Sequence, residues 1–262
     1  MPSPDVKRIA VGTYGPAQRI EPALHRLRAL VADLGVEIVD GDDVDLAVVL
    51  GGDGTMLRTL QRFLGTGVPV IGVNYGRVGF LSSMGPDDME DGLARAFRGE
   101  LRITELPTLE VELDGTSTVA VNDVVVASAV VGRMIELAWS VGGEALGMLP
   151  CDGVICAAPS GSTAYNLSSG GPVLVWGLDA MAVTFVSPHS LHARPLVVPR
   201  GLDLVVENGS ASAPATVIAD GIAVGELAPD RRATIRLGPE RSLLATLPEV
   251  TFLRRYSETF AS

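Results

Sequence analysis

Apolar runs of strand length alternate with helical patterns over the first part of the chain. Four short runs are predicted as strands: Val6–Val11, Val36–Val39, Asp45–Leu50 and Val68–Val73. Between them, apolar residues recur every three or four positions, the spacing of one helix face, in segments that begin near Ile20, Thr55 and Asp87. Strands that alternate with helices predict βαβ units around a parallel sheet. Residues 1–100 are therefore expected to form an α/β domain.

The pattern changes after Gly99. Residues 101–235 consist of short apolar runs broken by Gly, Pro, Asn and Ser, with helical spacing only near 162–168. Such a pattern predicts a β-rich domain, here expected to be a β-sandwich. Phe252, Tyr256 and Phe260 lie four residues apart and predict a terminal helix that must pack on something.

Composition narrows the class of protein. With 47% hydrophobic residues and a mean hydropathy of +0.34, the chain can bury a sizeable core. A net charge of −11 argues against a nucleic-acid surface. The start lacks the pattern of a signal peptide, and no apolar run approaches the ~18 residues of a membrane span, so a cytoplasmic protein without membrane contact is expected.

The chain has two cysteines, Cys151 and Cys156. They lie five residues apart on a predicted strand, where side chains at odd separations point to opposite faces. We therefore expect neither a disulfide nor a zinc site, and a reducing compartment.

The run Leu46–Leu50 leads into Gly51-Gly52-Asp53-Gly54-Thr55, where a helical pattern starts at Thr55. Glycines allow the backbone to approach a bulky ligand, and amides at a helix start favour phosphate. Asp53 would repel phosphate unless it binds a proton, a metal or a hydroxyl. The turn therefore suggests phosphoryl transfer, with Asp53 handling the acceptor hydroxyl; the structural alternative is a tight turn with an incidental Asp.

Four further segments combine strands with polar residues. They are Val70–Leu81, Ala120–Val126, Cys151–Pro172 and Ser187–Pro199. Asn122 offers a donor and an acceptor suited to a base edge or a ribose, and the Asp123 carboxylate can accept paired hydroxyls. Hydroxyls and amides after Pro159 can bind a carboxamide or a ribose. Taken alone, the Asn122 segment is better explained as an Asx turn that starts a strand.

These motifs resemble those of the NAD kinases. The GGDGT run is shared by NAD kinases, diacylglycerol and sphingosine kinases and phosphofructokinases, whereas Cys151–Pro172 resembles the NAD kinase block nearly position for position. The likeness covers about residues 45–225. It implies a Rossmann-like parallel sheet completed by about residues 236–262, and a β-rich domain over 101–235. It also implies transfer of the ATP γ-phosphoryl group to the 2′-hydroxyl of the adenosine ribose of NAD⁺.

The resemblance also implies roles for single residues. Asp53 is the expected general base, and the expected ATP phosphate contacts are Gly51, Gly52, Gly54, Thr55 and Arg58. The expected dinucleotide contacts are Asn74, Phe80, Asn122, Asp123, Arg133, Asp152, Ser160, Thr163, Ala164, Tyr165, Ser168 and Ser187. The chain departs from the family pattern at Asp123, where Glu is usual, and at Pro150, Cys151 and Ile222.

Cofactor and partners follow from the same resemblance. Mg²⁺ is expected to be held largely by the triphosphate, with no metal-ligating side chain. His189 and His192 lie three apart, with no Cys or acidic residue close in sequence, so one of them is expected to brace a turn together with Arg194 rather than to bind zinc. ATP is the expected donor, with polyphosphate left open. A homodimer or homotetramer is expected, in which Ser187–Leu191 completes a neighbour's pocket. Two alternatives remain at this point: a lipid kinase, and a non-catalytic dinucleotide sensor.

Overall fold

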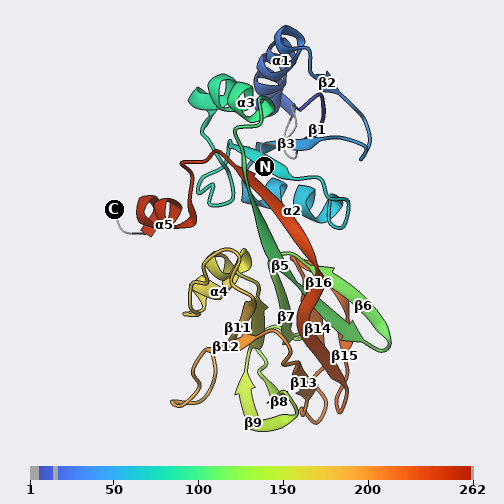
Figure 1. Ribbon diagram of the computed structural model, residues 1–262. Coiled ribbons are helices and arrows are strands. Elements are labelled where there is room, and N and C mark those ends of the chain that lie inside the picture. Colours follow the sequence, from blue (N-terminus) through green and yellow to red (C-terminus); the bar gives the residue numbers. More distant parts are fainter. Residues whose placement is uncertain (1–5, 14–16, 261–262) are drawn as a thin grey trace. The chain divides into compact units, whose positions relative to one another are not determined.

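A computed structural model describes residues 6–13 and 17–260 (Figure 1). The chain divides into two compact units, residues 1–105 with 242–262 (unit 1) and residues 106–241 (unit 2). The prediction that the chain starts without a leader concerns residues that lie partly outside the described ones. Within the described residues, no helix combines the length and hydrophobicity needed to cross a bilayer.

Unit 1 contains a parallel sheet in the order β2-β1-β3-β4, with the end of β16 beside β4. Its strands are β1 Arg8–Thr13, β2 Glu37–Ile38, β3 Leu46–Gly51, β4 Val70–Asn74 and the last residues of β16 Arg232–Thr246. Its helices are α1 Ala17–Leu34, α2 Asp53–Arg62, the 3₁₀ turn η1 Pro86–Asp88, α3 Met89–Phe97 and α5 Phe252–Phe260. The predicted α/β class is confirmed.

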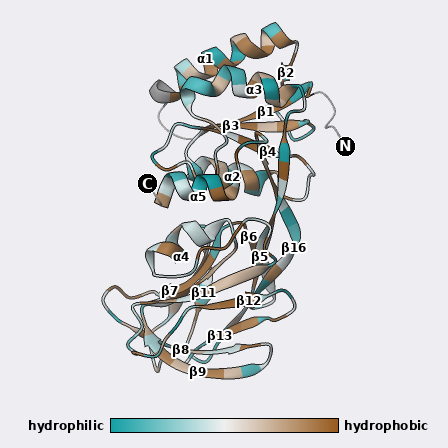
Figure 2. Ribbon diagram, turned by 60° about the vertical axis from the view of Figure 1, so that its left-hand side comes forward, coloured by the Kyte–Doolittle hydropathy of each residue, from teal (hydrophilic) through white to brown (hydrophobic). Residues whose placement is uncertain are grey.

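The core of unit 1 lies between this sheet and its helices. Every residue of β3 is buried, as expected of a central parallel strand covered on both faces. Leu27 of α1 and Leu93 of α3 belong to the same buried cluster as Leu46 and Leu50. Helix α1 carries hydrophilic and hydrophobic residues side by side (Figure 2), the pattern of a helix with one buried face.

Helix α2 lies close to the sheet because three strand positions are glycine. A Cβ on Gly12 would stand 2.4 Å from Thr59 Oγ1, and one on Gly72 would stand 2.4 Å from Met56 Sδ. A Cβ on Gly51 would stand 2.5 Å from Thr55 Oγ1. A side chain at these positions would force Thr59, Met56 or Thr55 to move. The absence of Cβ atoms at these glycines therefore allows α2 to approach the sheet closely.

Unit 2 consists of antiparallel strands. They are the end of β5 Arg102–Leu113, β6 Thr116–Ala120, β7 Asp123–Ser128, β8 Ile135–Val141, β9 Glu144–Cys151, β10 Gly153–Ala157, β11 Ala180–Val186, β12 Leu196–Pro199, β13 Leu204–Asn208, β14 Ala215–Ala219, β15 Ile222–Leu227 and most of β16. One sheet runs β12-β11-β10-β7-β14-β15. In the second, β16, β13, β8 and β9 follow one another, β5 pairs with β16, and β6 pairs with β5. The only helical turns described in unit 2 are η2 Gly161–Thr163 and α4 Tyr165–Ser168.

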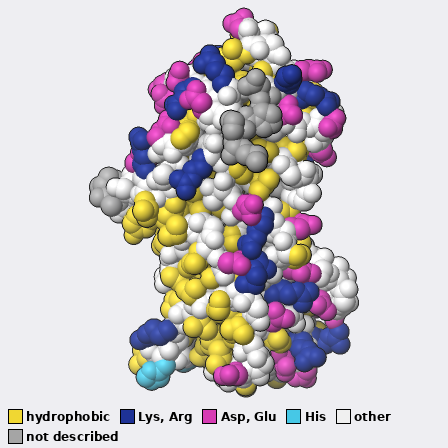
Figure 3. All heavy atoms as spheres, viewed as in Figure 1, with side chains coloured by type: hydrophobic (Ala, Val, Ile, Leu, Met, Phe, Trp, Pro, Cys, Tyr) yellow, Lys and Arg dark blue, Asp and Glu magenta, His cyan; other side chains and the backbone are white. Residues whose placement is uncertain are grey.

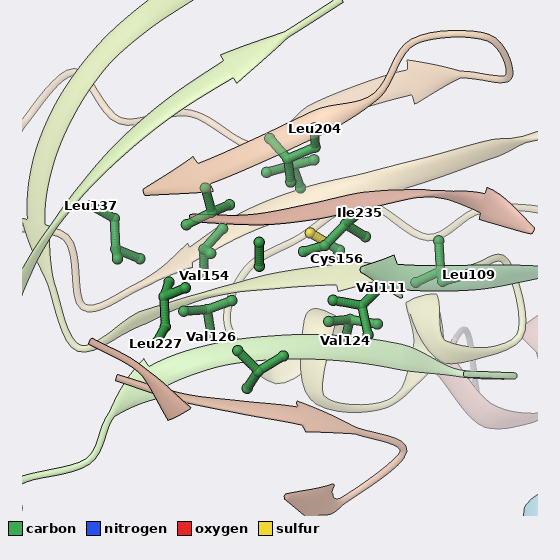
Figure 4. Close-up of a cluster of buried hydrophobic side chains, with 14 of the residues drawn as sticks. Leu109, Val111, Val124, Val126, Leu137, Val154, Cys156, Leu204, Leu227 and Ile235 are labelled. Carbon is green, nitrogen blue, oxygen red and sulfur yellow. The ribbon is translucent and has the colours of Figure 1, made fainter. Parts of the chain in front are cut away.

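The two sheets of unit 2 enclose one hydrophobic core (Figure 4). Val124, Val126 and Val154 of the six-stranded sheet belong to the same cluster as Leu204 and Ile235 of the other sheet. Inward-facing residues from two antiparallel sheets are the core of a β-sandwich. The predicted β-rich second domain is confirmed.

The prediction that Cys151 and Cys156 point to opposite faces was wrong. Cys151 ends β9 and Cys156 lies on β10, and these strands belong to different sheets, so both side chains enter the same core. Both thiols are free and buried. Burial raises the pKa of Cys151 to about 11, so this thiol is not a nucleophile near neutral pH.

Candidate active site

The turn Gly51–Thr55 joins the end of β3 to the start of α2. The helix begins at Asp53, two residues before the predicted Thr55, because the Gly52 carbonyl already accepts the N–H groups of Thr55 (2.9 Å) and Met56 (3.0 Å). Gly54 is exposed, and a Cβ built there meets no atom within 4 Å. The turn therefore presents an uncovered backbone at a helix N-terminus, where phosphate oxygens are favoured.

The Asp53 carboxylate is fixed by the backbone of a second loop. Its Oδ2 accepts the N–H groups of Gly79 and Phe80, each at 3.1 Å, and its Oδ1 accepts the N–H of Leu81 at 3.0 Å. A carboxylate offers about four lone-pair sites, so these bonds leave roughly one, on Oδ1. Asp53 is thus a rigid group with one oxygen able to accept a further proton donor.

The loop after β4 reaches Asp53 because of its glycines. Gly79 has φ +73°, and a Cβ there would stand 2.1 Å from Asn74 Nδ2, so neither its conformation nor its surroundings admit a side chain. Asn74 Oδ1 accepts the Gly76 N–H at 2.9 Å. A Cβ on Gly76 would stand 2.8 Å from Gly52 Cα, so this loop contacts the GGDGT turn directly.

The side chains of Asn74 and Phe80 contact other residues of unit 1. Asn74 shapes its own loop, as described above. Phe80 is 4% exposed, and its ring centroid lies 5.5 Å from that of Phe252 and 5.9 Å from that of Phe260. Their expected contacts with the dinucleotide stay predictions. Arg58 lies on the exposed face of α2, one turn after Gly54.

In unit 2 the residues Asn122 and Asp123 are held by Asp220. The Asp220 carboxylate accepts the N–H groups of Val121 (2.6 Å), Asn122 (2.7 Å) and Asp123 (3.0 Å). Asp220 has φ +48° and precedes Gly221 in the turn between β14 and β15. Asp220 was not among the predicted site residues, although the pair Asp220-Gly221 was the available signal in the sequence.

Two features of this pair indicate a ligand site. Asn122 Oδ1 is buried, and the described residues provide no hydrogen-bond donor for it. A buried polar atom without a partner is costly unless a ligand or water satisfies it. Burial, and then the neighbouring Asp220 carboxylate, raise the pKa of Asp123 to about 6. Perturbed carboxyl groups of this kind cluster at functional sites.

The segment after Pro159 packs against this pair. Ser160 Oγ donates to the Val121 carbonyl at 2.6 Å, and a Cβ on Gly161 would stand 2.1 Å from the Asn122 carbonyl oxygen. The structure therefore brings together Asn122, Asp123 and the start of the 160–168 segment. Later in that segment, Tyr165 is 46% exposed. Thr163 is partly buried, and Ala164 and Ser168 lie at the surface.

Asn166 fixes the shape of that segment, a role that sequence analysis missed. Its Nδ2 donates to the carbonyls of Ser162 (3.0 Å) and Pro172 (2.9 Å), and its Oδ1 accepts from Thr184 Oγ1 at 2.7 Å. A Cβ on Gly171 would stand 2.0 Å from Asn166 Oδ1. The glycines after Ser169 were visible in the sequence, but their partner was not.

Three predicted contacts lie elsewhere in unit 2. In the antiparallel register Ala157 pairs with Asp123, whereas Gly153, at the other end of β10, pairs with Ala127 and Val186. Asp152 and Ser187 directly adjoin the Gly153 end of β10. Arg133 lies in the loop that follows β7 at the same end, where it donates to Ser212 Oγ at 3.0 Å. At about 3.3 Å per residue, the length of β10 separates these residues from Asp123 by roughly 15 Å.

The raised pKa of Asp123 predicts a specific pH dependence of stability. Its folded-state pKa lies above the unfolded value of 3.8, so the folded protein binds the extra proton between these values. Stability from this group is therefore present at low pH and is lost as pH rises from about 4 to about 6. Asp123→Asn should raise the unfolding free energy at pH 7.5 by on the order of 1–3 kcal/mol.

Urea unfolding of both proteins at pH 4.5 and 7.5 measures this effect. The gain from Asp123→Asn should be larger at pH 7.5. Asp114→Asn, on an exposed turn of the same unit, is the matched control and should show no such pH-dependent gain. An equal effect of Asp123→Asn at both pH values would contradict the assigned cause.

The fold and these two groups of residues together define a class of enzyme. An α/β unit offers a glycine-lined helix start beside a carboxylate fixed by amides, which suits phosphoryl transfer to a hydroxyl. A β-sandwich unit offers a polar pair with an unsatisfied buried amide oxygen. These features define a kinase with two structural units.

Comparisons with known proteins identify the family. Residues 31–101 match the ATP-NAD kinase N-terminal domain, and residues 121–247 match the ATP-NAD kinase C-terminal domain. The NAD kinase of Heliobacterium modesticaldum is 39% identical over 237 residues, 88% of this chain and 84% of that protein. The NAD kinase of Gemmatimonas aurantiaca is 35% identical over 231 residues, 86% of this chain and 80% of that protein.

Comparison with solved structures agrees with these sequence matches. A crystal structure of an NAD kinase from Archaeoglobus fulgidus in complex with ATP has a TM-score of 0.79 and 27% identity, covering 97% of each chain. Yeast NADH kinase complexed with NADH shares the fold, with a TM-score of 0.83 at 20% identity, over 98% of this chain and 88% of that one.

The chain therefore belongs to the NAD kinase family, and its activity is that of an NAD kinase. The family resemblance noted in the motifs is confirmed. These matches favour NAD kinase over the lipid-kinase alternative.

Proposed function

We propose that Asp53 is the general base of an ATP-dependent phosphorylation of the 2′-hydroxyl of the adenosine ribose of NAD⁺. The observation that carries the proposal is the clamp of three loop amides on its carboxylate. The clamp leaves Oδ1 to accept the hydroxyl proton. Phosphoryl transfer depends mainly on positioning, and a late proton transfer to a fixed carboxylate fits that requirement.

The donor phosphates are proposed to bind at the start of α2. The backbone of Gly51, Gly52, Gly54 and Thr55 would approach them, with Arg58 adding charge. The helix N-terminus carries partial positive charge, which favours phosphate there. The Archaeoglobus relative was solved in complex with ATP, which supports ATP as donor. Use of polyphosphate is a separate question that the assay below addresses.

Magnesium is proposed to arrive as part of the Mg²⁺–ATP substrate. Among the described residues, no group of three or more His, Cys, Asp or Glu could hold a metal ion. Mg²⁺ commonly binds through substrate phosphates and water rather than through an all-protein cage.

The acceptor is proposed to bind in unit 2. Asn122 Oδ1, Asp123 and Ser160 lie together, and Thr163, Ala164, Tyr165 and Ser168 follow in the adjoining segment. The orphaned Asn122 oxygen suits an amino group of a base, and the Asp123 carboxylate suits ribose hydroxyls. Because the Asp123 carboxyl is protonated below about pH 6, NAD⁺ affinity is expected to fall under that pH.

Tyr165→Ala should raise the KM for NAD⁺ by at least about tenfold and leave the KM for ATP within about twofold. The reason is that its exposed ring is proposed to contact the dinucleotide alone. Leu178→Ala is the matched control, since Leu178 is equally exposed, at 46%, in the same unit. Initial rates with each substrate varied in turn measure both constants. Equal changes in both KM values would contradict the assignment.

We also propose a homodimer or homotetramer formed through unit 2. Hydrophobic side chains gather on the visible face of this unit (Figure 3). Leu191 is 87% exposed and Met148 is 55% exposed, and a hollow of about 290 Å³ beside them is lined by Trp139 and Phe185. Exposed apolar patches commonly mark interfaces. Asp152, Ser187 and Arg133 are proposed to complete the pocket of a neighbouring chain, which accounts for their distance from Asp123.

Mixing two inactive variants tests this shared pocket. Asn122→Ala and Asp152→Ala should each have low kinase activity. When the two variants are refolded together as dimers, half of the dimers should contain one copy of each, and each such dimer has one intact site of its two. The mixture should therefore recover about a quarter of wild-type activity. Two separately folded samples assayed together without exchange are the control. A mixture no more active than its components, or a fully active monomer by light scattering, would overturn the proposal.

A cytoplasmic location is part of the proposal. Both thiols are free in the core, which suits a reducing compartment.

The reaction itself is tested with a panel of substrates. Purified protein with Mg²⁺ is supplied with ATP or polyphosphate, and with NAD⁺, NADH or diacylglycerol vesicles. We expect phosphorylation of NAD⁺ with ATP and none of the lipid. Tight NAD⁺ binding without turnover would favour the dinucleotide sensor instead.

A further inference from the structure

The proposed function leaves the C-terminal helix α5 without a role. Helix α5 packs against the loop that follows β4 (Figures 1 and 2). Phe252 is buried, its ring meets Phe80 edge-on, and Phe260 contacts the same ring. Because the Phe80 N–H is one of the three donors to Asp53, α5 supports the segment that holds the catalytic carboxylate.

Arg255 of α5 binds the same loop through its guanidinium. Its Nη2 donates a hydrogen bond to the carbonyl oxygen of Ser82. Ser82 directly follows Leu81, whose N–H lies 3.0 Å from Asp53 Oδ1. The Ser82 N–H in turn donates to the Gly79 carbonyl at 3.3 Å, which closes the loop on itself. Arg255 therefore acts on the far end of the amide clamp.

The next residue is tied to both the sheet and the C-terminal segment. The Ser83 N–H donates to the Gly72 carbonyl at 2.8 Å, and Ser83 Oγ accepts the Leu247 N–H at 2.9 Å. The position of Ser83 is thus fixed independently of α5. What remains for Arg255 to determine is the orientation of the peptide at Ser82.

The placement of Arg255 is costly for a residue that only packs a helix. Its side chain is 19% exposed, burial lowers its pKa, and its buried Nε has no hydrogen-bond partner among the described residues. Buried charge is unfavourable unless it is well paired. Its ion pair with Glu258 is 3.5 Å long, and the Asp53 carboxylate adds only a longer-range attraction. The adjacent Arg254 is 58% exposed and pairs with Glu258 at 2.8 Å, showing that an arginine on α5 can remain in solvent.

We propose that Arg255 is a positioning residue for phosphoryl transfer. It holds the Ser82 carbonyl so that the N–H groups of Gly79, Phe80 and Leu81 remain aimed at Asp53. This inference rests on the catalytic role proposed for Asp53. Because a misplacement of about 1 Å can cost on the order of 100-fold in rate, its loss should reduce kcat and leave substrate binding unchanged.

The experiment is a double-mutant cycle between Asp53 and Arg255 in the full-length protein. Arg255→Met keeps the length of the side chain and removes its donors, and Arg254→Met is the matched control. We expect Arg255→Met to lower kcat at least about tenfold with KM for NAD⁺ and ATP within about twofold. In the Asp53→Asn background, Arg255→Met should change kcat by less than about twofold, because the clamp then has no carboxylate to aim.

Each outcome decides the proposal. A kcat for Arg255→Met within about twofold of wild type overturns it. An equal fractional loss with and without Asp53 also overturns it, because that is the result of a purely structural role. If Arg255→Met does not fold, Arg255→Leu, which also removes the donors, is judged by the same criteria. If Asp53→Asn alone keeps its activity, it is the role of Asp53 that fails, and the two failures are thereby distinguished.

Discussion

Asp53→Asn should reduce kcat by roughly 10²–10⁴-fold, the usual loss when a general base is removed. The Kd for NAD⁺ should stay nearly unchanged, since the acceptor is proposed to bind through Asn122 and Asp123. The carboxamide would retain one acceptor oxygen but would turn an NH₂ group toward at least one of the three loop amides. A modest loss of thermal stability should therefore accompany the loss of activity.

Rates of NADP⁺ formation and calorimetric titration with NAD⁺ measure the two effects separately. Asp43→Asn is a suitable control, since the Asp43 side chain is 95% exposed and forms a surface ion pair with Arg8. A rate above about a third of wild type, well short of the expected 10²–10⁴-fold loss, would mean that Asp53 does not act as the base.

Gly54→Ala should fold normally and lose affinity for ATP. A Cβ at Gly54 meets no protein atom within 4 Å, so the protein itself accepts the methyl group. Alanine in a helix is even favoured over glycine by roughly 0.5–1 kcal/mol. The same methyl group would stand where the phosphates are proposed to approach the backbone. We expect KM for ATP to rise at least about tenfold, with the melting temperature maintained or raised.

Two other glycines provide matched controls. Gly76→Ala should lower the melting temperature, because its Cβ would stand 2.8 Å from Gly52 Cα. Gly85→Ala should change neither the melting temperature nor the KM for ATP, since the nearest atom to its Cβ lies 4.0 Å away. A Gly54→Ala enzyme with the wild-type KM for ATP would show that the phosphates bind elsewhere.

The elements that could be predicted are those in which local pattern and tertiary environment agree. The terminal helix Phe252–Phe260 was predicted with its bounds, because its aromatic residues repeat every four positions. The helical spacing expected from near Asp87 is found in α3, where Met89, Leu93 and Phe97 are all buried. In such segments the hydrophobic period alone specifies which face is covered.

The site was predictable where a motif is continuous in sequence and obscure where it depends on distant contacts. The GGDGT turn could be recognised, but the amides that clamp Asp53 lie 26 to 28 residues later. Asp220 lies 97 residues or more from the amides it binds, and Arg255 lies 173 residues from Ser82. No local propensity encodes such pairs.

The misplaced cysteines have a similar cause. A five-residue separation predicts opposite faces only if both residues belong to one strand. Here Asp152 separates β9 from β10, and the chain passes from one sheet to the other between the two thiols. A change of sheet across one intervening residue is not marked by the period of the apolar positions on either side.

The most direct test of the account is the position of the phosphate in the product. Purified protein is incubated with Mg²⁺–ATP and NAD⁺, and the products are examined by ³¹P NMR. The account predicts one phosphomonoester on the 2′-oxygen of the adenosine ribose for each ADP formed, and its loss in Asp53→Asn. ADP without a phosphorylated dinucleotide, or a phosphate on another hydroxyl, would contradict it.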